Sequence, residues 1–341
     1  MALLIFDSNQ LLLLSGQAKK NHIIGLLYYE HMNGRRPTTL DASRIALLVE
    51  EQVAHLVSSL RPDYLAALEA ALKTEVSSRG RAVLEQLVSN AYLARAEGLP
   101  LCQDTGYVWV CLEVNGPVCV PGDVFSGVDA AVARAFEASG MRPSMLGDAL
   151  MDRTNTHNNT PAFCEVLLRQ EKDVCFAATT EPELKAGVAQ TEPGQPSAIL
   201  HIMLKGGGSD NASSLAQLPP SAGVEGVLDF VTDVVASGGV NACPPLVIGV
   251  GVGGTFDKVA GLAKHALLRP LGVVHPVKEI SSLEHKLLAR LNALDIGPGG
   301  LGGSTTALAV HIESAPCHLA TLPVAVCIGC TALRSASITL A

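Results

Sequence analysis

The chain has 341 residues, 48% of them apolar and 16% charged, a composition that indicates a folded chain with about two domains and excludes intrinsic disorder. Its formal net charge of −8 argues against a nucleic-acid partner, and no apolar stretch is long and unbroken enough to predict a membrane span. Nine cysteines, an odd number, argue against a closed disulfide framework, so a reducing, cytoplasmic compartment is expected.

The first 98 residues divide into two parts. Residues 1–38 are expected to be an N-terminal extension, disordered or loosely packed, because the apolar run 11–14 has no basic leader and Met32 precedes a plausible natural start. Residues 39–98 are expected to be a helical lead-in, with apolar residues at helical spacing in 45–60, 64–72 and 81–96. The first of these helices is expected to begin near Asp41, a typical N-cap residue.

From residue 99 onward, short apolar runs alternate with amphipathic segments. Strands are predicted at 107–114, 118–120, 162–168, 173–178, 198–204, 246–252, 308–312 and 323–328. Helices are predicted at 124–140, 223–236, 256–268 and 281–294. The predicted fold class is therefore α/β, with a helical N-terminal lead-in followed by mixed sheets with flanking helices.

Three cysteines stand where predicted strands meet loops. Cys102 lies in Leu-Cys-Gln-Asp-Thr-Gly just before a strand, Cys243 opens Cys-Pro-Pro before another strand, and Cys330 closes the last apolar run. Side chains at such transitions are held on a rigid scaffold and can converge, so a shared metal site is one interpretation. Packing is the usual role of any single buried cysteine, and the gaps between these three match no standard zinc motif.

Three other motifs have competing interpretations. Cys327 and Cys330 form a Cys-x-x-Cys pair, which could be redox-active but lies in an apolar run and not at a helix start. Gly249-x-Gly251-x-x-Gly254 matches the dinucleotide fingerprint between a strand and a helix, which would suit a nucleotide-dependent oxidoreductase. The loop 205–208, Lys-Gly-Gly-Gly, could bind a carboxylate through its backbone N–H groups or could be a structural turn.

Several longer motifs, in order along the chain, resemble the catalytic alpha half of the iron–sulfur hydro-lyases, the family that contains class I fumarate hydratase and L(+)-tartrate dehydratase. The similar segments are CQDTG at 102–106, NTHNNTPA at 155–162, KGGGSDN at 205–211, NACPP at 241–245, IGPGGLGGSTTAL at 296–308 and C-x-x-x-R at 330–334. The resemblance implies that residues 39–341 form one catalytic domain. Its α/β part, 99–341, would surround a cluster site lined by glycine loops.

The resemblance also implies a cofactor and the residues that serve it. A 4Fe–4S cluster would be held by Cys102, Cys243 and Cys330, with one iron left open to act as a Lewis acid on a small dicarboxylate. Five residues are assigned to the substrate pocket: Gln103, Arg142 and Gly207 as substrate-binding, and Asp104 and His318 as catalytic. Arg142 would clamp a carboxylate, while the two catalytic residues would hold the hydroxyl group or relay a proton.

The activity implied is the reversible hydration of fumarate to malate, with L(+)-tartrate dehydration as the alternative. Two departures from the usual family pattern bear on substrate choice: His157-Asn158 replaces Gly-Asp, and Ser304 stands where a lysine is common. The chain ends soon after Cys330, so a beta-type swivelling subunit is expected to complete the site, in a heterotetramer built on a homodimer of alpha chains. A non-catalytic assembly subunit is the remaining alternative.

Overall fold

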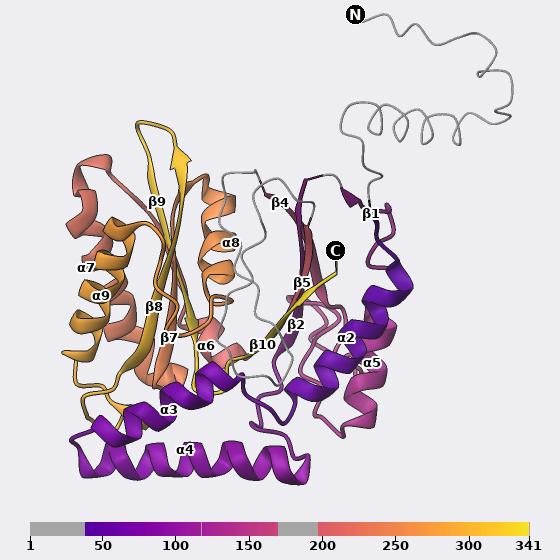
Figure 1. Ribbon diagram of the computed structural model, residues 1–341, viewed down its shortest axis with the longest axis horizontal. Helices are drawn as coiled ribbons and strands as arrows, with labels where there is room; N and C mark the ends of the chain where they lie inside the picture. The colour runs from indigo at the N-terminus through magenta and orange to yellow at the C-terminus, as the bar shows by residue number, and fades with distance from the viewer. Residues whose placement is uncertain (1–37, 117, 170–196, 341) are drawn as a thin grey trace, which may run out of the picture.

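The computed structural model describes residues 38–340 except 117 and 170–196 (Figure 1). Within this part, the helical lead-in consists of α2 (Ala42–Leu56), α3 (Pro62–Thr74) and α4 (Ser78–Glu97), as predicted. Helix α2 begins after Asp41, whose carboxylate accepts a hydrogen bond from the Ser43 N–H at 2.9 Å and caps the helix. The predicted strand at 173–178, and all but the last residue of the predicted extension at 1–38, lie outside the described residues.

Two four-stranded mixed sheets form the body of the fold, which confirms the α/β class. The first sheet has the order β10-β5-β2-β4 and the second has the order β6-β9-β7-β8. In the first, β2 (Tyr107–Asn115) pairs parallel with β4 (Phe163–Arg169) and antiparallel with β5 (Ser197–Lys205), which pairs antiparallel with β10 (Arg334–Thr339). In the second, β7 (Leu246–Gly254) pairs parallel with β8 (Ala307–Cys317) and antiparallel with β9 (Leu322–Gly329), which pairs antiparallel with β6 (Ser214–Leu218). A short parallel pair joins β1 (Thr38–Thr39) to β3 (Val118–Cys119).

Helices separate the two sheets and cover their outer faces (Figure 1). Helix α8 (Phe256–Ala266) lies between the sheets, and its Val259 and Ala263 belong to one buried cluster with Trp109 of β2 and Val247 of β7. The outer face of the first sheet is buried by α2 and α5 (Val128–Ala138). The outer face of the second is buried by α7 (Gly223–Gly238) and α9 (Lys278–Asn292). Helices α3 and α4 lie along one end of both sheets, so this end is closed by the lead-in (Figure 1).

The glycine fingerprint lies inside this packing and does not form a phosphate loop. Gly249 and Gly251 are interior residues of β7, and a Cβ atom on them would lie 2.1 Å from the Ala263 carbonyl oxygen and 2.3 Å from the Val259 carbonyl oxygen. Both carbonyls belong to α8, so these glycines allow the helix to approach the strand closely. The nucleotide interpretation is therefore wrong, because the space that a dinucleotide would need is filled by the chain's own helix.

Three described strands, β1, β6 and β10, were not predicted from the sequence. Strand β1 has two residues, β6 reads Ser-Leu-Ala-Gln-Leu, and β10 reads Arg-Ser-Ala-Ser-Ile-Thr, so none has a long apolar run. Strand β10 is nevertheless buried along most of its length, because it completes the edge of the first sheet beside β5. Among the described helices, none has the length and apolar character that crossing a membrane requires.

Candidate metal centre

Cys243 and Cys330 lie together because of the strand pairing in the second sheet. Strand β7 begins three residues after Cys243, and β9 ends at the residue before Cys330. Since β7 and β9 are antiparallel, with Val247 opposite Gly329, the start of one strand lies beside the end of the other. The backbone N–H of Thr331 donates a hydrogen bond to the Cys243 carbonyl oxygen at 3.1 Å, which ties the two loops together.

Cys102 reaches the same place because the chain crosses from one sheet to the other just after Cys330. Residues 330–333 connect β9 of the second sheet to β10 of the first. Strand β10 begins beside the end of β5, and the end of β5 pairs with Tyr107 at the start of β2. The loop before β2 carries Cys102, which packs with Cys330 in a small apolar cluster that also contains Leu101 and Ala332. The three predicted cysteines therefore converge at one end of the two sheets.

The chemistry of the three thiols suits an iron–sulfur cluster. Thiolates are soft ligands, and cysteine thiolates are the usual protein ligands of such clusters. Burial raises the pKa of both Cys330 and Cys243, and the charge of Cys102 raises it further, so binding of a metal group would displace their protons.

Cys327 is separate from this centre, although it forms a Cys-x-x-Cys pair with Cys330 in the sequence. Its side chain belongs to the buried cluster between the sheets, whereas Cys330 belongs to the small cluster with Cys102. Burial also raises the pKa of the Cys327 thiol, which disfavours the reactive thiolate. The geometry thus offers no support for a redox pair.

A buried arginine beside the cysteines fits a negatively charged group at this place. The Arg334 Nη2 atom donates to the backbone oxygen of Asp104 at 2.8 Å, and its Nε atom donates to the backbone oxygen of Ala332 at 3.2 Å. Its Nη1 atom is buried and has no hydrogen-bond partner among the described residues. Three thiols and an unsatisfied cationic donor make a donor set that fits an iron–sulfur cluster.

Four of the five predicted pocket residues lie at or next to the Cys102 loop. Gln103 is exposed beside Cys102, and the Asp104 carboxylate accepts from the Gly106 N–H at 3.0 Å. The predicted carboxylate-binding loop faces Asp104, since a Cβ atom on Gly206 would lie 2.9 Å from its Oδ2 atom, and the exposed Gly207 follows in α6 (Gly207–Asn211).

Arg142 is tied to the same loop through its backbone. The Thr105 hydroxyl donates to the Arg142 carbonyl oxygen at 2.7 Å, while the Arg142 side chain is exposed. The loop that carries the exposed Arg142 side chain is thus anchored to the loop that carries Cys102, Gln103 and Asp104.

His318 is not brought to the cysteines. It lies in the exposed turn between β8 and β9, whereas Cys330 follows the other end of β9. An extended strand of eight residues spans about 26 Å, so β9 holds His318 and Cys330 at opposite ends, far apart in space. The catalytic role of His318 stays a prediction that this chain's own geometry does not support.

Asn159 is a residue of the site that sequence reasoning did not single out. It is fully buried, its Oδ1 atom accepts from the Ser144 N–H at 2.8 Å, and its Nδ2 atom donates to the Gly106 carbonyl oxygen at 3.1 Å. The amide therefore fixes the loop that carries Arg142 against the loop that carries Cys102. Its place in the NTHNNTPA segment was the available signal, but a motif alone does not show which of its asparagines is buried.

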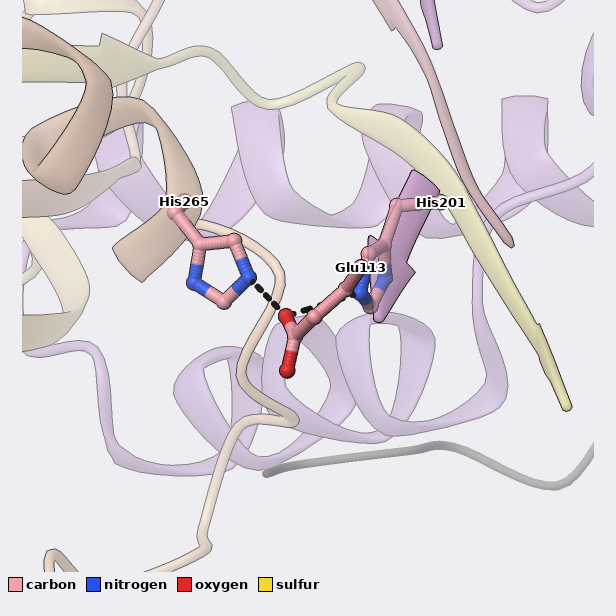
Figure 2. A group of neighbouring side chains, drawn as sticks. All are labelled: Glu113, His201 and His265. Carbon is pink, nitrogen blue, oxygen red and sulfur yellow. Dashed lines mark hydrogen bonds and ion pairs between the residues drawn. The ribbon is translucent and has the colours of Figure 1, made fainter. Parts of the chain in front are cut away.

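A second group of possible ligands, Glu113, His201 and His265, lies elsewhere in the interior (Figure 2). The Nε2 atoms of both histidines point to the same carboxylate oxygen, at 2.6 Å for His265 and 3.3 Å for His201. The guanidinium of Arg169 lies 3.0 Å from one ring nitrogen of His265 and 3.2 Å from the other. The positive charge of Arg169 lies next to the nitrogen atoms that would have to bind a metal cation, and it would repel such an ion. We therefore interpret the group as an internal ion-pair network, separate from the cysteines.

Comparisons with known proteins point to one family. Residues 46–339 match the family model described as fumarate hydratase (fumerase). A Methanocaldococcus jannaschii chain, provisionally named L(+)-tartrate dehydratase subunit alpha, is 36% identical over 301 residues, which cover 86% of this chain and 96% of the relative. The L(+)-tartrate dehydratase subunit alpha of Escherichia coli (strain K12) is 30% identical over 292 residues, which cover 86% of this chain and 89% of the relative. The subunit of the same name from Shigella sonnei is similar to the same extent.

Proposed function

The chain belongs to the fumarate hydratase family and is a hydro-lyase subunit, and on that premise we propose that it works with a 4Fe–4S cluster on a 2-hydroxy-dicarboxylate. The single observation that carries the proposal is the convergence of Cys102, Cys243 and Cys330 from three distant segments beside an arginine with an unsatisfied donor. When bound, the cluster would supply a Lewis-acidic iron with an open coordination position.

The chain's own residues would bind and orient the substrate beside the three cysteines. Arg142, with its exposed guanidinium and anchored backbone, would clamp one substrate carboxylate as a fork. Gln103 and the N–H groups near Gly207 would donate to the remaining substrate oxygens. Asp104, whose Oδ1 atom accepts a hydrogen bond from the Gly106 N–H, would hold the substrate hydroxyl group by accepting a hydrogen bond from it at the Oδ2 atom.

The ligand assignment is tested by anaerobic reconstitution with iron and sulfide. Wild-type protein is expected to bind the cluster and show its visible absorbance, and Cys102→Ser, Cys243→Ser and Cys330→Ser are each expected to lose most of it. Cys327→Ser is the matched control, because this thiol lies in a different cluster of side chains and should leave the absorbance intact. Intact absorbance in all three ligand variants would overturn the assignment.

Two substrates remain to be compared. Fumarate and malate are proposed from the family, whose model describes fumarate hydratase, while L(+)-tartrate is the alternative that the names of the relatives favour. Turnover of malate and of L(+)-tartrate by the reconstituted protein with a beta-type chain decides between them. Equal failure on both substrates, with the cluster present, would leave the non-catalytic alternative as the better account.

A beta-type partner is proposed because the relatives are named as alpha subunits. We further propose that the assembly is a heterotetramer built on two alpha chains, and that the partner supplies basic groups opposite Arg142. Light scattering of the chain alone and with a beta-type chain measures both steps. A beta-type chain that neither binds this chain nor raises its activity would contradict this part.

A further inference from the structure

Arg334 is the largest side chain among the described residues that is less than 2% exposed. Taking a guanidinium out of water is costly unless its charge is offset and its donors are hydrogen-bonded. A fully buried arginine therefore requires hydrogen-bond acceptors for its N–H groups and a negative group that offsets its charge.

The printed partners of Arg334 account for only part of its bonding capacity. Its Nε atom bonds the Ala332 carbonyl oxygen at 3.2 Å, and its Nη2 atom bonds the carbonyl oxygens of Asp104 at 2.8 Å and Thr105 at 3.3 Å. All three acceptors are uncharged, and no ion pair joins the guanidinium to a carboxylate within the described part of the chain. The Nη1 atom, which is buried, has no partner there at all.

The three carbonyl bonds also fix where the guanidinium lies. Ala332 belongs to the loop that follows Cys330, while Asp104 and Thr105 belong to the loop that follows Cys102. The planar fork therefore bridges the two loops that carry predicted ligands. Burial lowers the pKa of Arg334. The nearby groups Cys330, Cys102 and Asp104, in that order, act in the opposite direction and favour the charged guanidinium.

We propose that Arg334 is a positioning residue whose Nη1–H donates a hydrogen bond to a sulfur of the cluster held by Cys102, Cys243 and Cys330. The inference rests on the proposed function, since it needs a cluster. It assigns a role to a residue that is neither a proposed cluster ligand nor a proposed substrate-pocket residue. A cluster sulfur would accept a hydrogen bond from the Nη1–H group, which otherwise has no acceptor among the described residues. The negative thiolates and sulfides would also offset the buried positive charge of Arg334. Hydrogen bonds and positive charge at cluster sulfurs raise the reduction potential and strengthen retention of the cluster.

The test uses the full chain carrying its reconstituted cluster. Arg334→Lys keeps the charge but loses the planar fork, and Arg334→Met keeps the length but loses the charge. Both variants are expected to show a more negative cluster reduction potential, by more in Arg334→Met, and loss of iron to a chelator about tenfold faster, as one lost charge-assisted hydrogen bond predicts. Arg269→Lys is the matched control, since Arg269 is also buried but pairs with Glu284 away from the cysteines, and it should leave the potential unchanged.

A second measurement does not depend on the variants folding. Wild-type protein with ¹⁵N-labelled arginine, its cluster reduced to a paramagnetic state, is expected to show a weak nitrogen hyperfine coupling. The coupling should persist in Arg142→Lys, which removes the arginine assigned to the substrate pocket. Unchanged potential in Arg334→Lys and Arg334→Met, or absence of the coupling, overturns the proposal while the cluster itself stands. Failure of wild-type protein to bind any cluster overturns the proposed function and this inference together.

Discussion

Cys243 has a backbone conformation that a side chain normally avoids. Its φ is 55° and its ψ is 71°, in the left-handed region, directly after the 3-10 turn Gly239–Ala242. For residues other than glycine this region costs roughly 1–2 kcal/mol, and such strain gathers at functional sites. The strain at Cys243 indicates that the position is kept for its thiol, because glycine would fit the backbone better.

Replacing Cys243 by glycine is therefore expected to stabilise the protein without its cluster by about 1 kcal/mol, since it relieves the left-handed strain. The same variant should bind no cluster. Urea denaturation of the cluster-free protein measures the first effect and iron analysis the second. Cys243→Ala is the control, because it removes the thiol but keeps the Cβ atom and the strain, so its stability should stay within about 0.5 kcal/mol of the wild type. A glycine variant no more stable than the alanine variant would contradict the argument.

At the scale of single residues, the sequence predicted the site residues that lie next to the ends of strands. The three cysteines were found because each lies next to a predicted strand, and strand ends are brought together by sheet pairing. Asn159 was missed because its importance depends on which side chain of a polar loop turns inward. The predicted strand at 323–328 already lies between His318 and Cys330, and β9 extends it by one residue at each end; the role of His318 came from the resemblance and not from this spacing.

The contact between β7 and α8 depends on glycines that have no room for a side chain. A Cβ atom on Gly251 would lie 2.3 Å from the Val259 carbonyl oxygen and 2.8 Å from the Ala263 nitrogen, and neither backbone atom can move without shifting the helix. Gly251→Ala is therefore expected to destabilise the protein by about 3 kcal/mol, measured by chemical denaturation.

Gly261→Ala is the matched control within the same pair of elements. Gly261 lies in α8 with no atom within 4 Å of a Cβ position, so alanine should stabilise the helix by about 0.5–1 kcal/mol. Opposite signs for the two variants would show that close approach, and not glycine content, is what β7 requires. A tolerated Gly251→Ala would mean that the helix can move away from the strand at little cost.

The glycine loop before β8 binds a carboxylate of the chain itself. Glu75, between α3 and α4, accepts hydrogen bonds from the backbone N–H groups of Ser77, Ser304 and Thr305, each at 2.9 Å. Burial raises the pKa of Glu75, but these hydrogen bonds outweigh it and lower the pKa to about 2. This glycine loop, within 296–308, is thus an internal link between the helical lead-in and the second sheet.

Glu75→Gln is expected to lower the free energy of unfolding by about 2 kcal/mol at neutral pH. A glutamine amide has one acceptor oxygen, so it cannot accept hydrogen bonds at both terminal atoms as the carboxylate does. The folded pKa of about 2 is below the ordinary value of 4.5, so the carboxylate's contribution is complete above pH 4.5 and is lost as pH falls through 2. Urea denaturation from pH 7 to pH 3 should show the two proteins converging toward acid. Glu225→Gln is the control, since that carboxylate is exposed and ion-paired on the surface, and its stability should follow that of the wild type at every pH. A constant gap at all pH values would contradict the assignment.

At the scale of elements, the sequence predicted most helices and strands because their apolar spacing is regular. Strand β10 was missed because its burial comes from its neighbours, β5 and α2, and not from its own residues. The glycine motifs were found but their partners were not, because a carboxylate or helix that fills a glycine loop lies far away in the sequence. Close approach between distant segments is a tertiary property, which local patterns do not contain.

At the scale of the whole molecule, the two four-stranded sheets of the described residues are joined through α8, and a charged network crosses this junction. Glu113 comes from β2 and His201 from β5 in the first sheet, His265 comes from α8, and Glu313 comes from β8 in the second sheet. Arg169 of β4 pairs with both carboxylates. Strands from both sheets and the helix between them are thus linked by buried ion pairs.

His265 is the central cation of this network. Burial lowers its pKa, but the carboxylates of Glu313 and Glu113 outweigh the burial and raise the pKa to about 9. They lie 2.7 Å and 2.6 Å from its two ring nitrogens, so both nitrogens donate and the ring is an imidazolium. Burial lowers the pKa of the neighbouring His201, which stays neutral and accepts from the Ser337 hydroxyl group.

The junction should therefore weaken in alkaline solution. A folded pKa of about 9, above the ordinary value of 6.5, means that the His265 contribution is complete below pH 6.5 and is lost as pH rises through 9. His265→Gln is expected to be less stable by about 3 kcal/mol at pH 6.5, because it leaves two buried carboxylates short of a partner, and to lack this alkaline loss. Urea denaturation between pH 6 and pH 10 measures both.

His311→Gln is the control for that experiment. Burial lowers the pKa of His311 to about 3, so this ring is neutral throughout the alkaline range and its variant should keep the wild-type loss of stability above pH 6.5. If His265→Gln loses stability with rising pH as steeply as the wild type does, the proton on His265 is not what joins the sheets. The link would then come from Arg169 and the two carboxylates alone, whose charges do not change in this range.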